Sequence, residues 1–242
     1  MESTDLRTLW KRCFDEDDAF LDLFFATAYD PARSLCLHRA GRLAAALYWL
    51  DAAFQGRKLA YVYAVGTDPA FRGQGLCREL MEKTHKALSG QGYAGSILVP
   101  GAEPLRQMYQ AMGYETCTAI DRIACQAGEK IPLRPVEAAE YAALRRKLLP
   151  EGGVIQEGAS LSLLAGYADL YAGADFLLAV EKGGQRTALE LLGNPAAGPG
   201  ILAALGRDRG TFPTPGDSLP FAMFRPLVPE AEAPSYFGLA FD

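Results

Sequence analysis

Two glycines separated by one residue lie in a short polar loop, which reads Arg72, Gly73, Gln74, Gly75. An aromatic and β-branched run at residues 61–65 predicts a strand before this loop, and residues 76–88 have the spacing of an amphipathic helix. Glycines let the backbone approach a bound group closely, and a helix start offers unpaired N–H donors and a positive dipole end. The junction is therefore predicted to bind an anion, and we expect a phosphate-bearing cofactor there.

The elements around this junction can be placed from hydrophobic spacing and turn residues. Before it, the pattern predicts two helices and then three strands, at residues 6–14, 19–28, 34–38, 42–54 and 59–65. After the helix at 76–88, it predicts a strand, a second helix and a further strand, at residues 93–100, 104–112 and 114–125. The first half is thus a meander of strands flanked by helices.

Element order and loop motif together resemble the GNAT superfamily of N-acetyltransferases, over about residues 6–115. That family binds acetyl-CoA through a loop of the form Q/R-x-x-G-x-G/A. This chain follows the pattern except at the last place, where Cys77 replaces Gly or Ala. The resemblance implies that the cofactor phosphates are bound by Arg72, Gly73, Gln74, Gly75, Leu76 and Cys77. For Arg72 a second interpretation is that it only braces the loop, and for the glycines that they only form a tight turn.

The strand before the loop has an implied role as well. In proteins similar to this one it splays from its neighbour, and its backbone groups pair with the pantetheine arm. The resemblance places the N–H of Tyr63 at the acetyl carbonyl, with Ala64 and Val65 along the pantetheine. Backbone donors aimed at a developing oxyanion are a strong catalytic device.

A tyrosine is the candidate general acid. Residues 105–114 resemble the family's helix ending in Y-x-x-x-G-[FY], whose tyrosine lies near the CoA sulfur, and the matching residue is Tyr109. The alternative is a tyrosine that packs its ring and hydrogen-bonds its hydroxyl.

The general base is not assigned. Some relatives place a Glu early in the motif strand, where this chain has Leu59. Tyr61 or Tyr63, which share one side of the strand, could position an ordered water. The other candidates are Glu103, His38 and His85, and none of these residues is assigned as the base.

Composition excludes several classes of protein. A formal net charge of −5 argues against nucleic-acid binding, and the longest basic run, residues 145–147, is typical of a solvated helix face. Five widely spaced cysteines and two histidines predict neither a disulfide framework nor a metal site. Without a signal-type N-terminus or a membrane-length apolar run, we expect a cytoplasmic protein that does not bind membranes.

The second half changes character, so we expect two domains, at residues 1–128 and 131–242. The later part reads as a smaller α+β lobe and faintly resembles a degenerate GNAT-like copy, with residues 188–192 as its central strand. Late strands are expected at residues 221–227 and 236–241. The glycine signature does not recur there, so we expect no second CoA site, and this lobe would complete the sheet, shape the acceptor pocket or support a homodimer. Its excess of carboxylates could steer a cationic acceptor.

These observations lead to one main hypothesis and two rivals. The expected fold is α/β (α+β), with a GNAT-type mixed, mostly antiparallel sheet flanked by helices. The expected function is transfer of the acetyl group of acetyl-CoA, without a metal, to a primary amine of a small molecule or peptide. The first rival is a non-catalytic acyl-CoA-binding sensor or interaction module. The second keeps the fold but transfers a longer acyl group.

Overall fold

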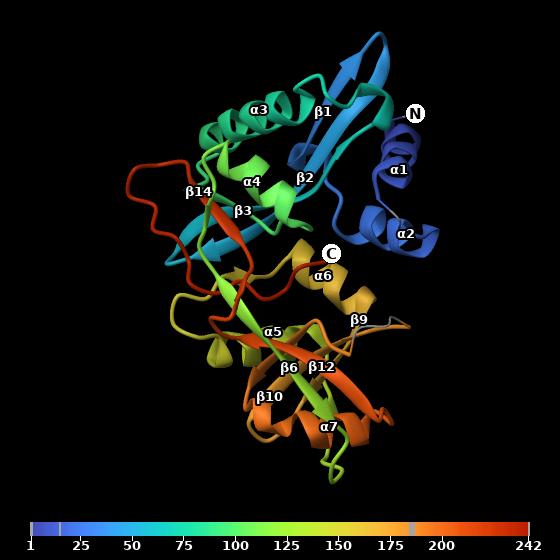
Figure 1. The fold of residues 1–242 in the computed structure, drawn as a ribbon, viewed down its shortest axis with the longest axis vertical. Helices are drawn as coiled ribbons and strands as arrows, with labels where there is room; N and C mark the ends of the chain where they lie inside the picture. Colours follow the sequence, from blue (N-terminus) through green and yellow to red (C-terminus); the bar gives the residue numbers. More distant parts are fainter. Residues whose placement is uncertain (1, 15, 184–186, 242) are drawn as a thin grey trace.

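The structure is a computed structural model that describes residues 2–14, 16–183 and 187–241. The ribbon forms two lobes, with the early elements in one and most of the late elements in the other (Figure 1). None of the helices formed by the described residues is long and apolar enough to cross a membrane.

Seven strands of the described chain form the sheet of the first lobe, in the order β1-β2-β3-β4-β14-β5, with β8 paired to β2. Among these strands β3 and β4 run parallel, and the other pairs are antiparallel. The strands are β1 (Ser34–Arg39), β2 (Arg42–Phe54), β3 (Arg57–Thr67), β4 (Gly95–Leu98), β5 (Glu115–Thr116), β8 (Ile155–Gln156) and β14 (Met223–Pro226). This mixed, mostly antiparallel sheet confirms the predicted fold class.

Helices cover both faces of this sheet. Successive residues of a strand point to opposite faces, so Tyr61 and Tyr63 pack among the residues of α1 and α2, whereas Ala60 and Val62 pack among those of α3 and α4. The helices are α1 (Glu2–Cys13), α2 (Asp18–Thr27), α3 (Leu76–Gly90) and α4 (Glu103–Gln110), with the 3-10 turns η1 (Pro31–Arg33) and η2 (Pro69–Phe71). The candidate acid and the glycine loop therefore share one face.

The second lobe contains two smaller sheets, ordered β11-β10-β9-β7 and β12-β6-β13. Their strands are β6 (Ala119–Gln126), β7 (Arg134–Pro135), β9 (Ala168–Ala172), β10 (Phe176–Glu181), β11 (Glu190–Gly193), β12 (Arg209–Pro215) and β13 (Leu219–Pro220). The helices are α5 (Ala138–Leu148), α6 (Ala159–Tyr167) and α7 (Gly198–Ala204), with the 3-10 turn η3 (Pro195–Ala197).

One basic residue of α5 departs from its expected place. Arg145 is 3% exposed and pairs with the buried Glu190, so the expectation of a wholly solvated face at residues 145–147 is wrong for this residue. Arg146 beside it does lie at the surface and pairs with Glu157.

The elements predicted for the first half all occur, with ends shifted by a few residues, apart from one strand. The predicted strand at 114–125 breaks into β5 and β6. The break arises because the N–H groups of Cys117 and Thr118 both donate to the carbonyl of Ala222, while the Ala222 N–H donates to the Thr118 hydroxyl at 2.9 Å.

Two predictions for the second half are wrong. Residues 236–241 do not form a strand, because the N–H and carbonyl of Leu239 bond to the side chain of Gln156, at 3.2 and 2.6 Å, instead of to a neighbouring strand. Residues 188–192 do not supply a central strand, because β11 lies at the edge of its sheet.

Strands from both halves of the sequence are paired with each other. β6 precedes the predicted division at residue 128, yet it pairs with β12 and β13. β14 follows the division, yet it lies between β4 and β5. The two-domain division stays a prediction, but the lobes share chain segments whichever way they are divided.

Candidate active site

Strands β3 and β4 lie side by side at one end and separate at the other. Their described pairing ends where Tyr61 faces Ile97, although β3 continues to Thr67. Every strand residue carries an N–H and a carbonyl, so beyond Tyr61 the groups of β3 on this side are not taken by β4. The two strands form an open fork, as the family resemblance implied.

A β-bulge lies in the open part of β3. The pairing of β2 with β3 shifts by one residue, so Leu47 on β2 faces both Ala64 and Val65. Ala64 has a φ of +49°, a left-handed conformation that costs a non-glycine residue roughly 1–2 kcal/mol. A bulge bends its strand and redirects the backbone groups, and strained backbone gathers at binding and catalytic sites. The two residues predicted to lie along the pantetheine therefore form the bulge itself.

The glycine loop ends on Gly75, the N-cap of α3, which has a φ of +75° and no side-chain hydrogen bond to the cap. Gly73 also lies in the left-handed region, at +77°. A Cβ added at either glycine would meet no described atom within 4 Å. The first N–H groups of a 15-residue helix therefore face open space, with the positive end of its dipole behind them. This arrangement fits a phosphate group.

Leu76 and Cys77 anchor the start of α3 to the apolar cluster between this helix and the sheet. Leu76 is 3% exposed, and Cys77 packs against the same apolar cluster beneath the helix. Burial raises the pKa of the Cys77 thiol, so it stays protonated and uncharged near neutral pH. The departure from Gly or Ala at this position therefore adds no charge to the loop.

Cations close to the loop are engaged by the protein. Arg72 donates from Nε to the carbonyl of Thr67 at 3.1 Å, and Arg78 donates from Nη1 to the carbonyl of Ala111 at 3.1 Å. Arg72 braces the loop in this structure, and its contact with a phosphate stays a prediction. Gln74 is exposed at the tip of the loop.

Tyr109 lies at the C-terminal end of α4 and is 6% exposed. Its ring lies 5.8 Å from that of Tyr114 in an edge-on arrangement. It belongs to the same apolar cluster as Val62 on β3 and Leu76 at the start of α3. The structure thus brings together the three segments that the sequence motifs singled out, on one side of the sheet.

The side chain of Tyr63 lies on the opposite face. Its hydroxyl donates to the carbonyl of Phe241 at 2.7 Å, and its ring is 5.8 Å from that of Trp10. The ring of Tyr61 lies 4.8 Å from the ring of Phe237, which belongs to the same C-terminal segment. The predicted role of Tyr63 concerns its backbone N–H and stays a prediction. Its side chain instead holds the C-terminal segment, residues 236–241, along β3.

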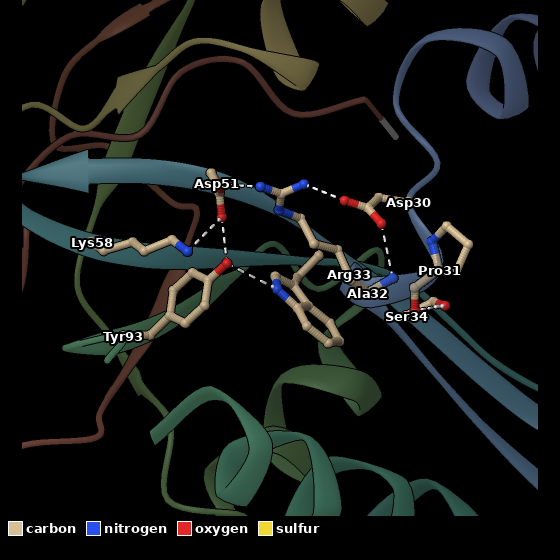
Figure 2. A network of polar contacts seen from close by, with 9 residues as sticks. Asp30, Pro31, Ala32, Arg33, Ser34, Asp51, Lys58 and Tyr93 are labelled. Atoms are coloured by element: carbon tan, nitrogen blue, oxygen red, sulfur yellow. Dashed lines mark hydrogen bonds and ion pairs between the residues drawn. The ribbon is translucent and has the colours of Figure 1, made fainter. Parts of the chain in front are cut away.

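A polar network secures the closed end of the fork, where β3 and the segment before β4 meet (Figure 2). Asp51 on β2 accepts hydrogen bonds from the Tyr93 hydroxyl and, at 2.7 Å, from Nη2 of Arg33. Lys58 on β3 lies 3.6 Å from the Asp51 carboxylate and covers the Tyr93 ring. Burial opposes ionisation of Asp51, but these bonds hold its pKa below the ordinary value. The network therefore fixes the point from which the strands diverge.

The candidates for a general base are placed as follows. β3 contains no carboxylate, since residues 57–67 include neither Asp nor Glu. His85 is 5% exposed, its Nε2 lies 2.8 Å from the Tyr114 hydroxyl, and burial lowers its pKa to about 4. His38 and Glu103 lie at the surface. In the described chain, no group of three or more His, Cys, Asp or Glu side chains is positioned to hold a metal ion.

A cavity of about 1040 Å³ lies where the two lobes meet. Its wall includes residues 99–101, which directly follow β4, and residues of β6 and β12. Residues 187–189, and residues 238 and 240 of the C-terminal segment, complete it. No sequence motif predicts this cavity, because its wall comes from segments that are far apart in the chain.

A known protein family matches the sequence of the first lobe. The family described as acetyltransferase (GNAT) domain matches residues 2–117, which run from α1 to the strand after α4. The matched range contains the fork, the glycine loop and Tyr109. No curated protein matches the chain.

Solved structures resemble the whole chain. A GCN5-related N-acetyltransferase from Anabaena variabilis has a TM-score of 0.68 at 17% identity, covering 93% of this chain and 71% of its own. Eis1 from Mycobacterium abscessus has a TM-score of 0.69 at 15% identity, with the same coverage. A putative acetyltransferase from Pyrococcus horikoshii has 0.63 at 13%, covering 98% and 90%. Identities this low show the fold alone, and the coverage shows that the likeness extends over both lobes.

Proposed function

We propose, from the match of residues 2–117 to the acetyltransferase (GNAT) domain, that the protein transfers the acetyl group of acetyl-CoA to a primary amine of a small molecule or peptide. The observation that carries the proposal is the open β3–β4 fork, whose bulged strand is followed by the 3-10 turn η2, the glycine loop and a helix start without a side-chain cap. Fork and helix start offer backbone donors to the two ends of one extended ligand.

The chain offers a contact for each part of acetyl-CoA. The N–H groups around Gly73 and Gly75 bind the pyrophosphate, for which the space beside these glycines is open. The bulge residues Ala64 and Val65 pair with the pantetheine arm. The N–H of Tyr63 polarises the acetyl carbonyl, since a preorganised backbone donor stabilises the developing oxyanion.

The transfer needs three proton movements. Once the acceptor ammonium has lost a proton, the amine nitrogen attacks the acetyl carbon, the carbon–sulfur bond breaks, and the thiolate of CoA takes a proton from the hydroxyl of Tyr109. The second proton that the attacking nitrogen gives up as the amide forms restores the hydroxyl of Tyr109. The ammonium proton of the acceptor leaves to solvent, directly or through a water molecule, because β3 brings no carboxylate to act as a base.

Replacing the hydroxyl of Tyr109 tests this mechanism. Tyr109→Phe keeps the buried ring, so acetyl-CoA should bind with unchanged affinity in calorimetry while turnover falls by about 100-fold, the usual contribution of a general acid. Tyr171→Phe, on β9 of the second lobe, is the matched control and should leave turnover unchanged. Undiminished turnover of Tyr109→Phe would remove this residue from the mechanism.

A non-catalytic acyl-CoA sensor is the second candidate, favoured by the absence of a carboxylate from β3. It predicts binding of acetyl-CoA without release of free thiol across a broad amine panel, whereas the transferase predicts release with at least one amine. The panel should include longer acyl-CoA donors, because a longer acyl group is compatible with the same contacts. A cytoplasmic location and a homodimer stay part of the proposal, and light scattering tests the dimer.

A further inference from the structure

The cavity between the lobes begins at the acyl-transfer end of the proposed active site. Its wall includes Val99, Pro100 and Gly101, which directly follow β4, one arm of the fork. It also includes Gly238 and Ala240 of the C-terminal segment, which runs along the other arm. Its volume of about 1040 Å³ is at the upper end of the range for ligand pockets. An acceptor larger than a simple alkylamine fits this space.

One side of a two-stranded ribbon forms the wall opposite β4. β6 and β12 pair antiparallel, with Arg122 facing Pro213 and Gln126 facing Arg209. Along most of the ribbon the cavity is lined by alternate residues, at positions 120, 122, 124 and 126 of β6 and 209, 211 and 213 of β12; the paired Cys125 and Gly210 line it as well. The intervening Phe212 is fully buried on the other side, where α7 packs. Strand alternation therefore fixes Arg122 and Arg209 on the cavity side.

The guanidinium groups of these two arginines are not held by other side chains or by the backbone of the described chain. In the part of the chain that the structure describes, neither Arg122 nor Arg209 forms an ion pair or a side-chain hydrogen bond, and both are exposed to the cavity and solvent. Arg106, the third arginine of the lining, is by contrast held by the carbonyls of Pro220 and Phe221, both at 3.1 Å. Two guanidinium groups are thus available to a ligand.

The charge of the lining contrasts with that of the protein. No described Asp or Glu lines the cavity, although the whole chain has a formal net charge of −5. Arginine binds carboxylate and phosphate through paired N–H donors, and no nearby carboxylate competes for those donors here. The lining is therefore suited to an anion and unsuited to a polycation, contrary to the steering expected from the acidic second half.

We propose that the amine acceptor also carries a carboxylate or phosphate group, which Arg122 and Arg209 bind while the amine reaches the fork. This inference rests on the proposed acetyl transfer and names the substrate class of the same site. Arg122 and the partner of Arg209 are four residues apart on β6, or about 13 Å along the strand. The two side chains therefore flank an extended acceptor, such as an amino acid derivative or a short peptide with a free carboxylate.

Matched amine pairs test the proposal in a thiol-release assay with acetyl-CoA. The pairs are lysine and cadaverine, phosphoethanolamine and ethanolamine, and glycylglycine and glycylglycinamide. The wild-type protein should have the higher kcat/KM for the anionic member of at least one pair. Arg122→Gln and Arg209→Gln should each raise KM for that member about tenfold, the effect of one lost hydrogen bond to a charged group. KM for the member that lacks the carboxylate or phosphate should not change.

Two controls separate this role from others. Arg57→Gln removes one positive charge from the exposed first residue of β3, away from the cavity, and should leave KM unchanged for both members of each pair. The affinity for acetyl-CoA, measured by calorimetry, should be the same in all variants. A weaker affinity for acetyl-CoA in Arg122→Gln or Arg209→Gln would assign these residues to the donor and overturn the proposal, as would equal preference for both members of every pair.

Direct binding distinguishes failure of the inference from failure of the proposed function. If no amine releases thiol, the acetyl transfer is wrong, and the anionic compounds are titrated into the protein saturated with acetyl-CoA. Binding that is lost in the Arg122→Gln, Arg209→Gln double variant would keep the anion site. No binding of any anionic compound would overturn it.

Discussion

Replacing Arg145 by Met should strongly destabilise the second lobe. Arg145 makes a two-point contact with Glu190, with Nε to Oε2 and Nη2 to Oε1 both at 2.8 Å, and the two side chains are 4% and 1% exposed. Glu190 also accepts a hydrogen bond from the Tyr236 hydroxyl at 2.8 Å. Removing one member of such a pair leaves a buried charge without its partner, which costs about 3–5 kcal/mol.

The adjacent arginine provides the matched control. Arg146 lies on the same helix and also pairs with a glutamate, Glu157, but the two side chains are 59% and 31% exposed. An exposed pair of this kind contributes at most about 1 kcal/mol. In denaturant unfolding, Arg145→Met should therefore lower the free energy of unfolding several times more than Arg146→Met. For a chain of this length, the loss at Arg145 corresponds to a fall in Tm of roughly 6–20 °C.

A double variant tests the electrostatic reason for the loss. In Arg145→Met with Glu190→Met, both charges are replaced by apolar side chains of similar length, and a buried pair exchanged in this way is often close to neutral. The double variant should be more stable than the sum of the two single losses by at least about 1 kcal/mol. Equal losses for Arg145→Met and Arg146→Met, or additive losses in the double variant, would refute the reasoning.

Two further predictions concern the loop and a buried histidine. Gly75→Ala and Gly41→Ala change glycines with φ of +75° and +74° and open surroundings, so each variant should lose about 1 kcal/mol of stability. Only Gly75→Ala should weaken acetyl-CoA binding in calorimetry. Equal affinities of the two variants for acetyl-CoA would show that the loop does not bind the cofactor. Burial lowers the pKa of His85 in the folded protein to about 4. As the pH falls, this histidine therefore binds a proton in the unfolded chain before it does so in the folded one. The free energy of unfolding should drop by up to about 3 kcal/mol between about pH 6.5 and pH 4. The free energy of unfolding should depend less steeply on pH across this range in His85→Gln than in the wild-type protein, and a wild-type slope in His85→Gln would contradict the assignment.

The features that the sequence predicted well are encoded by neighbouring residues. The helix at α3 follows from apolar spacing, and the loop before it from Gly73 and Gly75, which adopt the left-handed backbone that favours glycine. The resemblance to a known family then placed Tyr109 relative to that loop, and the fold brings the two segments into one apolar cluster. Local pattern and family motif were sufficient because both lie within one continuous stretch.

The features that were missed depend on distant partners. Ala64 has a left-handed backbone without being glycine, so nothing in its residue type marks the bulge, which arises from the pairing with β2. Arg145 stands in a basic triplet that looks solvated, and only the fold brings Glu190 to it. Arg122 and Arg209 are separated by almost ninety positions in the sequence, and the ribbon pairing places them on one wall.

The second half of the chain completes the site as well as forming its own lobe. β14 pairs with β4 on the side away from β3, so the arm of the fork that ends at Leu98 is held by residues 223–226. The C-terminal segment packs on Tyr61 and Tyr63 of the other arm, and its Gly238 lies so close to Glu190 that a Cβ would stand 1.8 Å from Oε1. Both arms of the fork therefore depend on the late chain, one through a strand pair and the other through a segment anchored at the buried ion pair. A fragment that stops at residue 128 would contain every motif residue but would lack the supports that hold β3 and β4 apart.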